Sequence, residues 1–155
     1  MNKIYQQLLK VLSSFDYVTN YFNVANNPVR NLQYKLLDAL KAEIRSMAWE
    51  AEHRLSKYYN DSADIFGSNE QAQVVIELDT TRADQVAKKI VSRFYYCCDK
   101  PTIYVALLYP GTDKMSVNEC KKYFKYGKKL LMKINEESMF IGVILGQDGT
   151  VQKIV

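Results

Sequence analysis

Three short apolar runs separated by helical segments constrain the fold of this chain more than any other feature. Residues 73–79 (QVVIELD), 102–109 (TIYVALLY) and 139–145 (MFIGVIL) are each typical of a buried strand. In the segments between them, at about 82–96 and 116–135, apolar residues recur at the spacing of a helix. Strands that alternate with helices favour a parallel or mixed sheet covered by helices. We therefore predict an α/β (α+β) fold with a small central mixed sheet.

The remaining segments complete this prediction. Residues 2–23 repeat apolar side chains at helical spacing, and Asn26-Asn27-Pro28 marks a break before a second, long helix over 28–58. Residues 63–66 and 151–155 have the composition of short strands. We expect a single domain, 1–155, with a helical N-terminal layer at 1–58 and an α/β core at 61–155.

Composition excludes several classes of protein. A hydrophobic content of 48% with 25% charged residues is the ordinary globular mixture. No apolar run approaches the roughly 20 residues that span a bilayer, and the N-terminus lacks the features of a signal peptide, so we expect a soluble cytoplasmic protein. His53 is the only histidine, and no CxxC pair, phosphate-binding glycine loop or HExxH motif is present. Zinc sites and histidine-assisted nucleophiles therefore have no support.

Two acids stand out on the first apolar run. Because side chains alternate across a strand, Glu77 and Asp79 share one face of it. Burying two carboxylates is costly unless a cation compensates them, and Mg²⁺ or Mn²⁺ prefers such oxygen ligands. Asp64 on the neighbouring predicted strand would converge on the same place, together with Glu50 or Glu43 from one flank of the long helix. The alternative is that these acids cap the next helix or pair with an arginine.

The helix after this strand carries a polar flank. Four of its side chains, at spacings of three, four and four, fall on one side: Arg82, Gln85, Lys89 and Arg93. Such a ridge is able to contact a phosphate backbone. The alternative is a solvated flank that pairs with nearby acids.

These residues resemble the PD-(D/E)XK nuclease superfamily, whose members include restriction enzymes and junction resolvases. Asp64 precedes Glu77-Leu78-Asp79 by twelve intervening residues, and the following helix carries Gln85 and the lysine pair Lys88 and Lys89. The resemblance spans about residues 43–109. It implies a restriction-endonuclease-like core, catalytic and metal-binding roles for Asp64 and Glu77, and a further catalytic acid at Glu50 or Glu43. Apart from the resemblance, Asp79 would be a further metal ligand or an orienting group at the catalytic site. Asp79 stands where the family pattern has lysine, so Lys88 or Lys89 would supply the catalytic amine.

A lysine-rich helix is a second, independent feature. Between Lys114 and Lys133 seven lysines face one acid, Glu119, which gives this segment a local net charge of +6 in a chain of net charge +4. Six of the lysines fall on one helical face: Lys121, Lys122, Lys125, Lys128, Lys129 and Lys133. They repel one another unless an anion is near, so nucleic acid is a reasonable partner. An ordinary solvated face remains the alternative.

The sequence thus predicts a magnesium- or manganese-dependent endonuclease-like hydrolase of phosphodiester bonds, with DNA as the favoured nucleic acid. The alternative is a catalytically inactive domain that binds nucleic acid or a protein through the helix at 116–135. A third interpretation, compatible with either, is a homodimer formed through the N-terminal helices.

Overall fold

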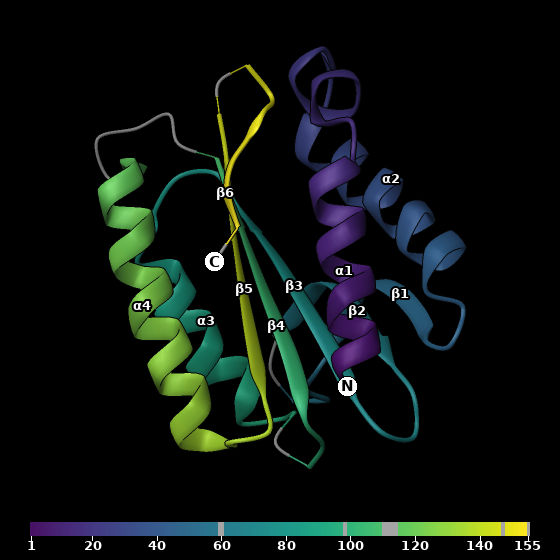
Figure 1. The fold of residues 1–155 in the computed structure, drawn as a ribbon, viewed down its shortest axis with the longest axis vertical. Coiled ribbons are helices and arrows are strands. Elements are labelled where there is room, and N and C mark those ends of the chain that lie inside the picture. Colours follow the sequence, from purple (N-terminus) through teal and green to yellow (C-terminus); the bar gives the residue numbers. More distant parts are fainter. Residues whose placement is uncertain (59–60, 98, 110–114, 147, 155) are drawn as a thin grey trace.

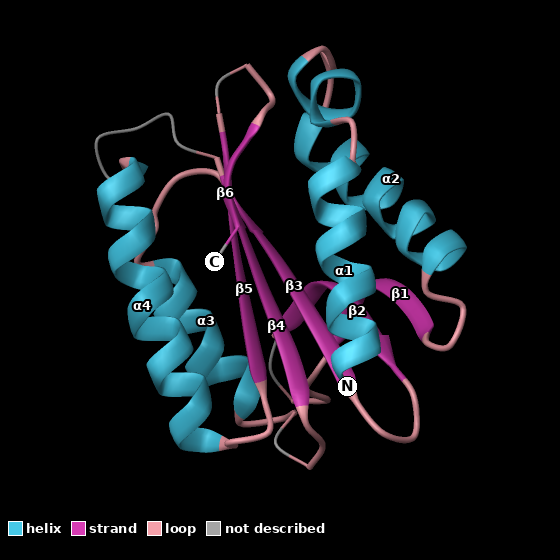
Figure 2. Ribbon diagram, in the orientation of Figure 1, coloured by secondary structure: helices cyan, strands magenta, loops and turns pink. Residues whose placement is uncertain are grey.

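A six-stranded mixed sheet lies between two layers of helices. The computed structural model describes residues 1–58, 61–97, 99–109, 115–146 and 148–154, and within these ranges the strand order is β1-β2-β3-β4-β5-β6. Helices α1 and α2 cover one face of the sheet and α3 and α4 cover the other (Figures 1 and 2). The predicted α/β class is therefore confirmed. No helix in the described part of the chain is long and apolar enough to cross a membrane.

The elements follow one another along the chain without a second sheet among the described residues. Their bounds are α1 (Asn2–Ser14), the π-helical turn η1 (Val18–Phe22), α2 (Pro28–Glu43), β1 (Ala48–Arg54), β2 (Ser62–Ser68), β3 (Gln73–Asp79), α3 (Gln85–Phe94), β4 (Thr102–Leu108), α4 (Val117–Ile134), β5 (Met139–Leu145) and β6 (Val151–Ile154).

The pairing of the strands changes twice across the sheet, from antiparallel to parallel and back to antiparallel. Strands β1, β2 and β3 form an antiparallel meander. Strands β3, β4 and β5 are parallel and are joined by α3 and α4, as the alternation of apolar runs and helices predicts. Strand β6 returns antiparallel to β5. The carboxyl ends of the three parallel strands therefore meet at one end of the sheet, which is the upper end in Figure 1.

The central strands are apolar because they are covered on both faces. On β3, Val74 and Ile76 pack in the core beneath α1 and α2, whereas Val75 packs in the core beneath α3 and α4. Strand β4 is buried along its whole length for the same reason. Two cores of this kind explain why these strands are continuous hydrophobic runs rather than alternating ones.

The first predicted helix is too long. Helix α1 ends at Ser14, because Phe15 is extended (φ −69°, ψ 136°), and residues 18–22 form the separate π-helical turn. The second helix begins as predicted, with Pro28 in its first turn. Helix α4 also begins as predicted: Ser116 caps it by accepting a hydrogen bond from the Glu119 amide at 3.3 Å. Lys114, counted above with the basic segment, lies outside the described residues.

The predicted helix over 28–58 is wrong in its second half. Helix α2 ends at Glu43, and Ala48–Arg54 is the edge strand β1. Trp49 explains the change: its indole nitrogen donates to the Ile44 carbonyl at 3.0 Å, and its ring covers Gly67, its partner on β2. A Cβ at position 67 would lie 2.5 Å from that ring, so only glycine admits this packing.

This correction separates the two acids predicted on one helix flank. Glu43 ends α2, where its carboxylate accepts from Lys10 at 2.6 Å. Glu50 lies on β1, where its carboxylate is 2.5 Å from Nδ1 of His53. Neither acid therefore takes the position on a shared helix face that the sequence pattern indicated.

Candidate active site

Asp64, Glu77 and Asp79 lie together at the junction of β2 and β3. Asp64 precedes Ile65 and Glu77 follows Ile76, and these two isoleucines are opposite each other in the antiparallel pair. The Asp64 carboxylate also accepts a hydrogen bond from the Leu78 amide at 2.7 Å. The strand predicted beside β3 is thus confirmed, and it brings the three acids to the face covered by α3.

Lys89 of α3 is the cation at the centre of these acids. Its Nζ lies 2.8 Å from Glu77 Oε2, 2.8 Å from Asp79 Oδ1 and 4.0 Å from Asp64 Oδ2. Lys88, the other lysine suggested by the family resemblance, is exposed. Of the two, Lys89 is therefore the one that the helix turns toward the acids.

Arg93, one turn further along α3, is buried against Glu77. Its Nε donates to Glu77 Oε1 at 2.6 Å, and its guanidinium also reaches Asp61 at 3.0 Å. Arg82 lies before α3 and makes two bonds to Asp84, at 2.8 and 2.6 Å. The four polar residues predicted as one ridge therefore do not form a shared exposed surface, because Lys89 and Arg93 turn inward.

Burial dominates the electrostatics of this cluster. Glu77 is only 1% exposed, and its burial raises the pKa to about 7 although Lys89 and Arg93 act to lower it. Burial likewise raises the pKa of Asp79. For Lys89, burial acts to lower the pKa, but the attraction of Glu77 and Asp79 outweighs it and the pKa is raised. Asp64, which is partly exposed, adds negative charge that raises the pKa of both other acids.

The raised pKa of Glu77 predicts a pH-dependent stability. The folded state takes up a proton at this site more readily than the unfolded chain, whose value is 4.5 against about 7 when folded. Stability from this group is therefore fully present below the unfolded pKa and is lost as the pH rises through the folded pKa. We expect the free energy of unfolding, measured by urea titration of the metal-free protein, to fall between about pH 5 and pH 8. Glu77→Gln should flatten this dependence, and an equally steep slope in that variant would contradict the assignment.

Several buried oxygens around the cluster lack hydrogen-bond partners. Among the described residues, Glu77 Oε2, Asp79 Oδ2 and the Tyr104 hydroxyl have none, although Lys89 lies at ion-pair distance from Glu77 Oε2. Buried polar atoms of this kind are usually satisfied by water or an ion. No group of three or more histidine, cysteine or acidic side chains in the described ranges is arranged to hold a metal alone. Mg²⁺ takes one or two carboxylates and completes its shell with water and phosphate, so it needs no such group of three; here Lys89 is the cation that lies between Glu77 and Asp79.

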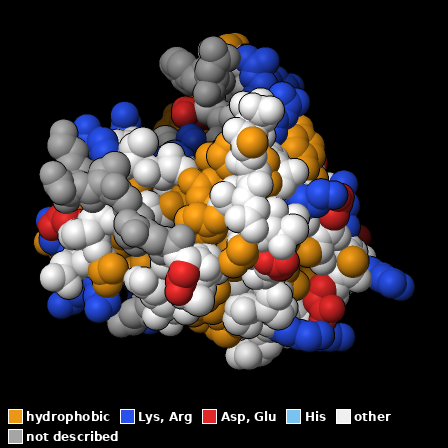
Figure 3. All heavy atoms as spheres, turned by 90° about the horizontal axis from the view of Figure 1, so that it is seen from above, with side chains coloured by type: hydrophobic (Ala, Val, Ile, Leu, Met, Phe, Trp, Pro, Cys, Tyr) orange, Lys and Arg blue, Asp and Glu red, His pale blue; other side chains and the backbone are white. Residues whose placement is uncertain are grey.

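The basic face of α4 lies away from the acids. All six of its lysines are exposed, and among the described residues only Lys122 forms an ion pair, with Glu119 at 2.7 Å. Helix α4 packs on α3 and β5, whereas the acids lie on β2 and β3. Figure 3, seen from above, shows Lys and Arg side chains on both sides of the molecule, the α4 side included, and hydrophobic side chains in the middle.

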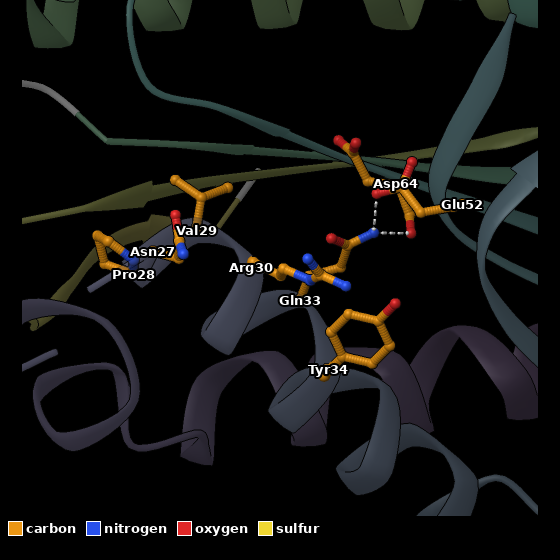
Figure 4. A pocket seen from close by; sticks show the side chains of 8 residues that line it. All are labelled: Asn27, Pro28, Val29, Arg30, Gln33, Tyr34, Glu52 and Asp64. Carbon is orange, nitrogen blue, oxygen red and sulfur yellow. Dashed lines mark hydrogen bonds between the residues drawn. The ribbon is translucent and has the colours of Figure 1, made fainter.

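Sequence reasoning missed a buried glutamine that supports Asp64. Gln33 of α2 is 5% exposed, and its Nε2 donates to the Asp64 carbonyl at 2.5 Å and to Glu52 Oε1 at 2.8 Å (Figure 4). A polar residue on the apolar stripe between Leu32 and Leu36 was the available signal. The sequence pattern does not reveal the contact between Gln33 and Glu52, because it predicts one helix over 28–58 that contains both residues.

Comparison with known proteins adds little to this site. No family model and no curated protein matches the sequence. One similar solved structure is that of Pyrococcus furiosus SfsA in complex with Ca²⁺, with 12% identity and a TM-score of 0.38. The match covers 80% of this chain and 63% of that protein, so it spans less than two thirds of the latter. A likeness at this TM-score carries no functional argument, and the site rests on its own geometry.

Proposed function

We propose that this chain is a metal-dependent phosphodiesterase that hydrolyses nucleic acid, with Asp64, Glu77, Asp79 and Lys89 as its working residues. The observation that carries the proposal is the contact of Lys89 Nζ with Glu77 and Asp79 at 2.8 Å, and with Asp64 at 4.0 Å. The resemblance to the PD-(D/E)XK superfamily supports it, because α3 supplies the lysine that the strand lacks. The strand order and directions are compatible with the core which that resemblance implies.

Each residue has a defined task in this proposal. Mg²⁺ or Mn²⁺ held by one or two of the carboxylates of Asp64, Glu77 and Asp79, with water and phosphate completing its shell, would supply Lewis-acid activation and neutralise charge. Lys89 donates to the non-bridging oxygens of the scissile phosphate and stabilises the negative charge that develops there. Arg93 holds Glu77 in place through the Nε–Oε1 bond and acts as a positioning residue.

Cleavage of single- and double-stranded DNA and RNA with Mg²⁺ or Mn²⁺ tests the proposal. Asp79→Asn, which keeps the side-chain volume, should abolish cleavage and weaken Mn²⁺ binding in calorimetry. Lys89→Met should lower the cleavage rate by about 10²–10³-fold, the effect of removing one donor to a developing charge. Asp38→Asn, an exposed acid on α2, is the matched control. Absence of metal-dependent cleavage by the wild-type protein on all four substrates would refute the proposal.

A second function is favoured by a different observation. The six lysines on one face of α4 are exposed, and of these only Lys122 forms an ion pair among the described residues, which favours a domain that binds nucleic acid but does not cleave it. The exposed lysines of α4 would then provide the interaction. This alternative predicts salt-sensitive binding to nucleic acid that neither Mg²⁺ nor Asp79→Asn changes.

A further inference from the structure

A pocket beside Asp64 has no part in the chemistry described above. It measures about 550 Å³ and opens between the first turns of α2 and the strands β1 and β2 (Figure 4). Its volume is within the range of small-molecule sites, roughly 300–1,000 Å³. The residues that line it are Asn27, Pro28, Val29, Arg30, Gln33, Tyr34, Glu52 and Asp64. Because Asp64 belongs to both, the pocket adjoins the acid cluster.

We propose that this pocket binds one nucleobase of the nucleic acid, and guanine in preference to the other bases. The substrate class rests on the proposed function, whereas the choice of base rests on the pocket alone. Three features carry the inference: the hydrogen-bonding character of one wall, an accessible aromatic ring and an unpaired cation.

One wall of the pocket offers hydrogen-bond acceptors. Gln33 uses Nε2 for two bonds, to the Asp64 carbonyl at 2.5 Å and to Glu52 Oε1 at 2.8 Å. A side-chain amide has two N–H donors, so these bonds use both and leave its carbonyl oxygen. Glu52, held by this bond at a backbone φ of 52°, adds an exposed carboxylate. A ligand must therefore bring donors to this wall.

The opposite wall suits a flat ring with an attached phosphate. Tyr34 is 42% exposed, and the Arg30 guanidinium lies 5.8 Å from the centre of its ring. Among the described residues Arg30 forms no ion pair. The guanidinium lies over this ring, so a base that stacks on Tyr34 would replace it there. The displaced guanidinium, which has no ion pair within the described part of the chain, is a good partner for the phosphate attached to the base.

Guanine matches the acceptor wall best. It presents two adjacent donors, N1–H and the N2 amino group, which fit the two oxygens of one carboxylate. Adenine and cytosine present one amino group beside an acceptor, and uracil presents one N–H between two carbonyls. The uracil carbonyls would face the oxygens of Gln33 and Glu52, so uracil is disfavoured.

The test is a titration of the metal-free full-length chain with the four nucleoside 5′-monophosphates, followed by NMR. All four carry the same phosphate, so differences in affinity report the base. We expect GMP to bind about tenfold more tightly than UMP, the discrimination of one bidentate pair, with shifts at the Gln33 side-chain amide. Glu52→Gln should remove this preference, and Tyr34→Ala should weaken all four ligands. Glu70→Gln, an exposed acid in the β2–β3 turn, is the control.

Two results would overturn the inference: equal binding of GMP and UMP, or a GMP preference that survives Glu52→Gln. The measurement needs neither metal nor cleavage, so it is separable from the proposed function. Base-selective binding without cleavage would retain the pocket and refute the phosphodiesterase. Cleavage without base-selective binding would support the phosphodiesterase and refute the guanine pocket.

Discussion

Glu77→Ala is expected to lower the free energy of unfolding by about 3–5 kcal/mol, the usual cost of removing one partner of a buried ion pair. Glu77 is almost fully buried, with Arg93 at 2.6 Å and Lys89 at 2.8 Å. Without its carboxylate, Arg93 keeps among the described residues the partly exposed Asp61 and a hydrogen bond to the Ser92 hydroxyl. Urea denaturation of the metal-free protein near pH 7, followed by circular dichroism, measures the loss.

Two variants make this result interpretable. Glu77→Gln keeps the volume and one acceptor oxygen for Arg93, so it should lose less stability than Glu77→Ala. Glu70→Gln should change stability by less than about 0.5 kcal/mol, as surface substitutions usually do. A loss below about 1 kcal/mol for Glu77→Ala would show that the cluster is not held together by this carboxylate. The expected loss is also why Asp79→Asn, rather than Glu77→Ala, is the better test of catalysis.

Charge reversal on α4 should have the largest effect on binding. Replacing Lys121, Lys125 and Lys128 by Glu is expected to lower the affinity for duplex DNA by more than about 100-fold at low salt, since the electrostatic contribution to binding grows with the number of neutralised phosphates. If each lysine neutralises one phosphate, the slope of log affinity against log salt should fall in magnitude by about 3. Fluorescence anisotropy over a series of salt concentrations measures both quantities.

The matched control changes the same net charge elsewhere. Lys3, Lys35 and Lys41 are exposed on α1 and α2, and replacing all three by Glu should leave most of the affinity intact. An equal loss in both triple variants would mean that binding follows the net charge of the protein and not the face of α4.

The sequence predicted the parts of the fold that depend on local pattern. Strands β3, β4 and β5 were evident because burial on both faces requires continuous apolar runs. Strand β1 was not, because its residues, AWEAEHR, include good helix formers and no glycine or proline separates them from α2. What makes this segment a strand is its pairing with β2 and the fit of Trp49 over Gly67, a contact across the sheet that no local pattern contains.

In the candidate site, too, the sequence predicted what depends on local pattern and not what depends on contacts between distant elements. Alternation along β3 was enough to place Glu77 and Asp79 on one face, and the position of Asp64 followed once β2 was assigned. The inward direction of Lys89 and Arg93 depends on how α3 packs against the acids of β2 and β3, a tertiary contact that helical periodicity does not contain. The contribution of Gln33 depends on α2 lying against β1 and β2, and the sequence pattern predicts α2 and β1 as one helix.

The consecutive strand order bears on how the protein forms. Each strand pairs with the strand that precedes or follows it in the chain. The antiparallel pairs β1–β2 and β2–β3 close only short connections, whereas the parallel pairs β3–β4 and β4–β5 must close over α3 and α4, and pairing of that kind is slower. The meander of β1, β2 and β3 is able to assemble before β4 is available, and it already contains all three acids. If the sheet grows from this meander, Asp64, Glu77 and Asp79 come together before β4, α4 and β5 join the sheet.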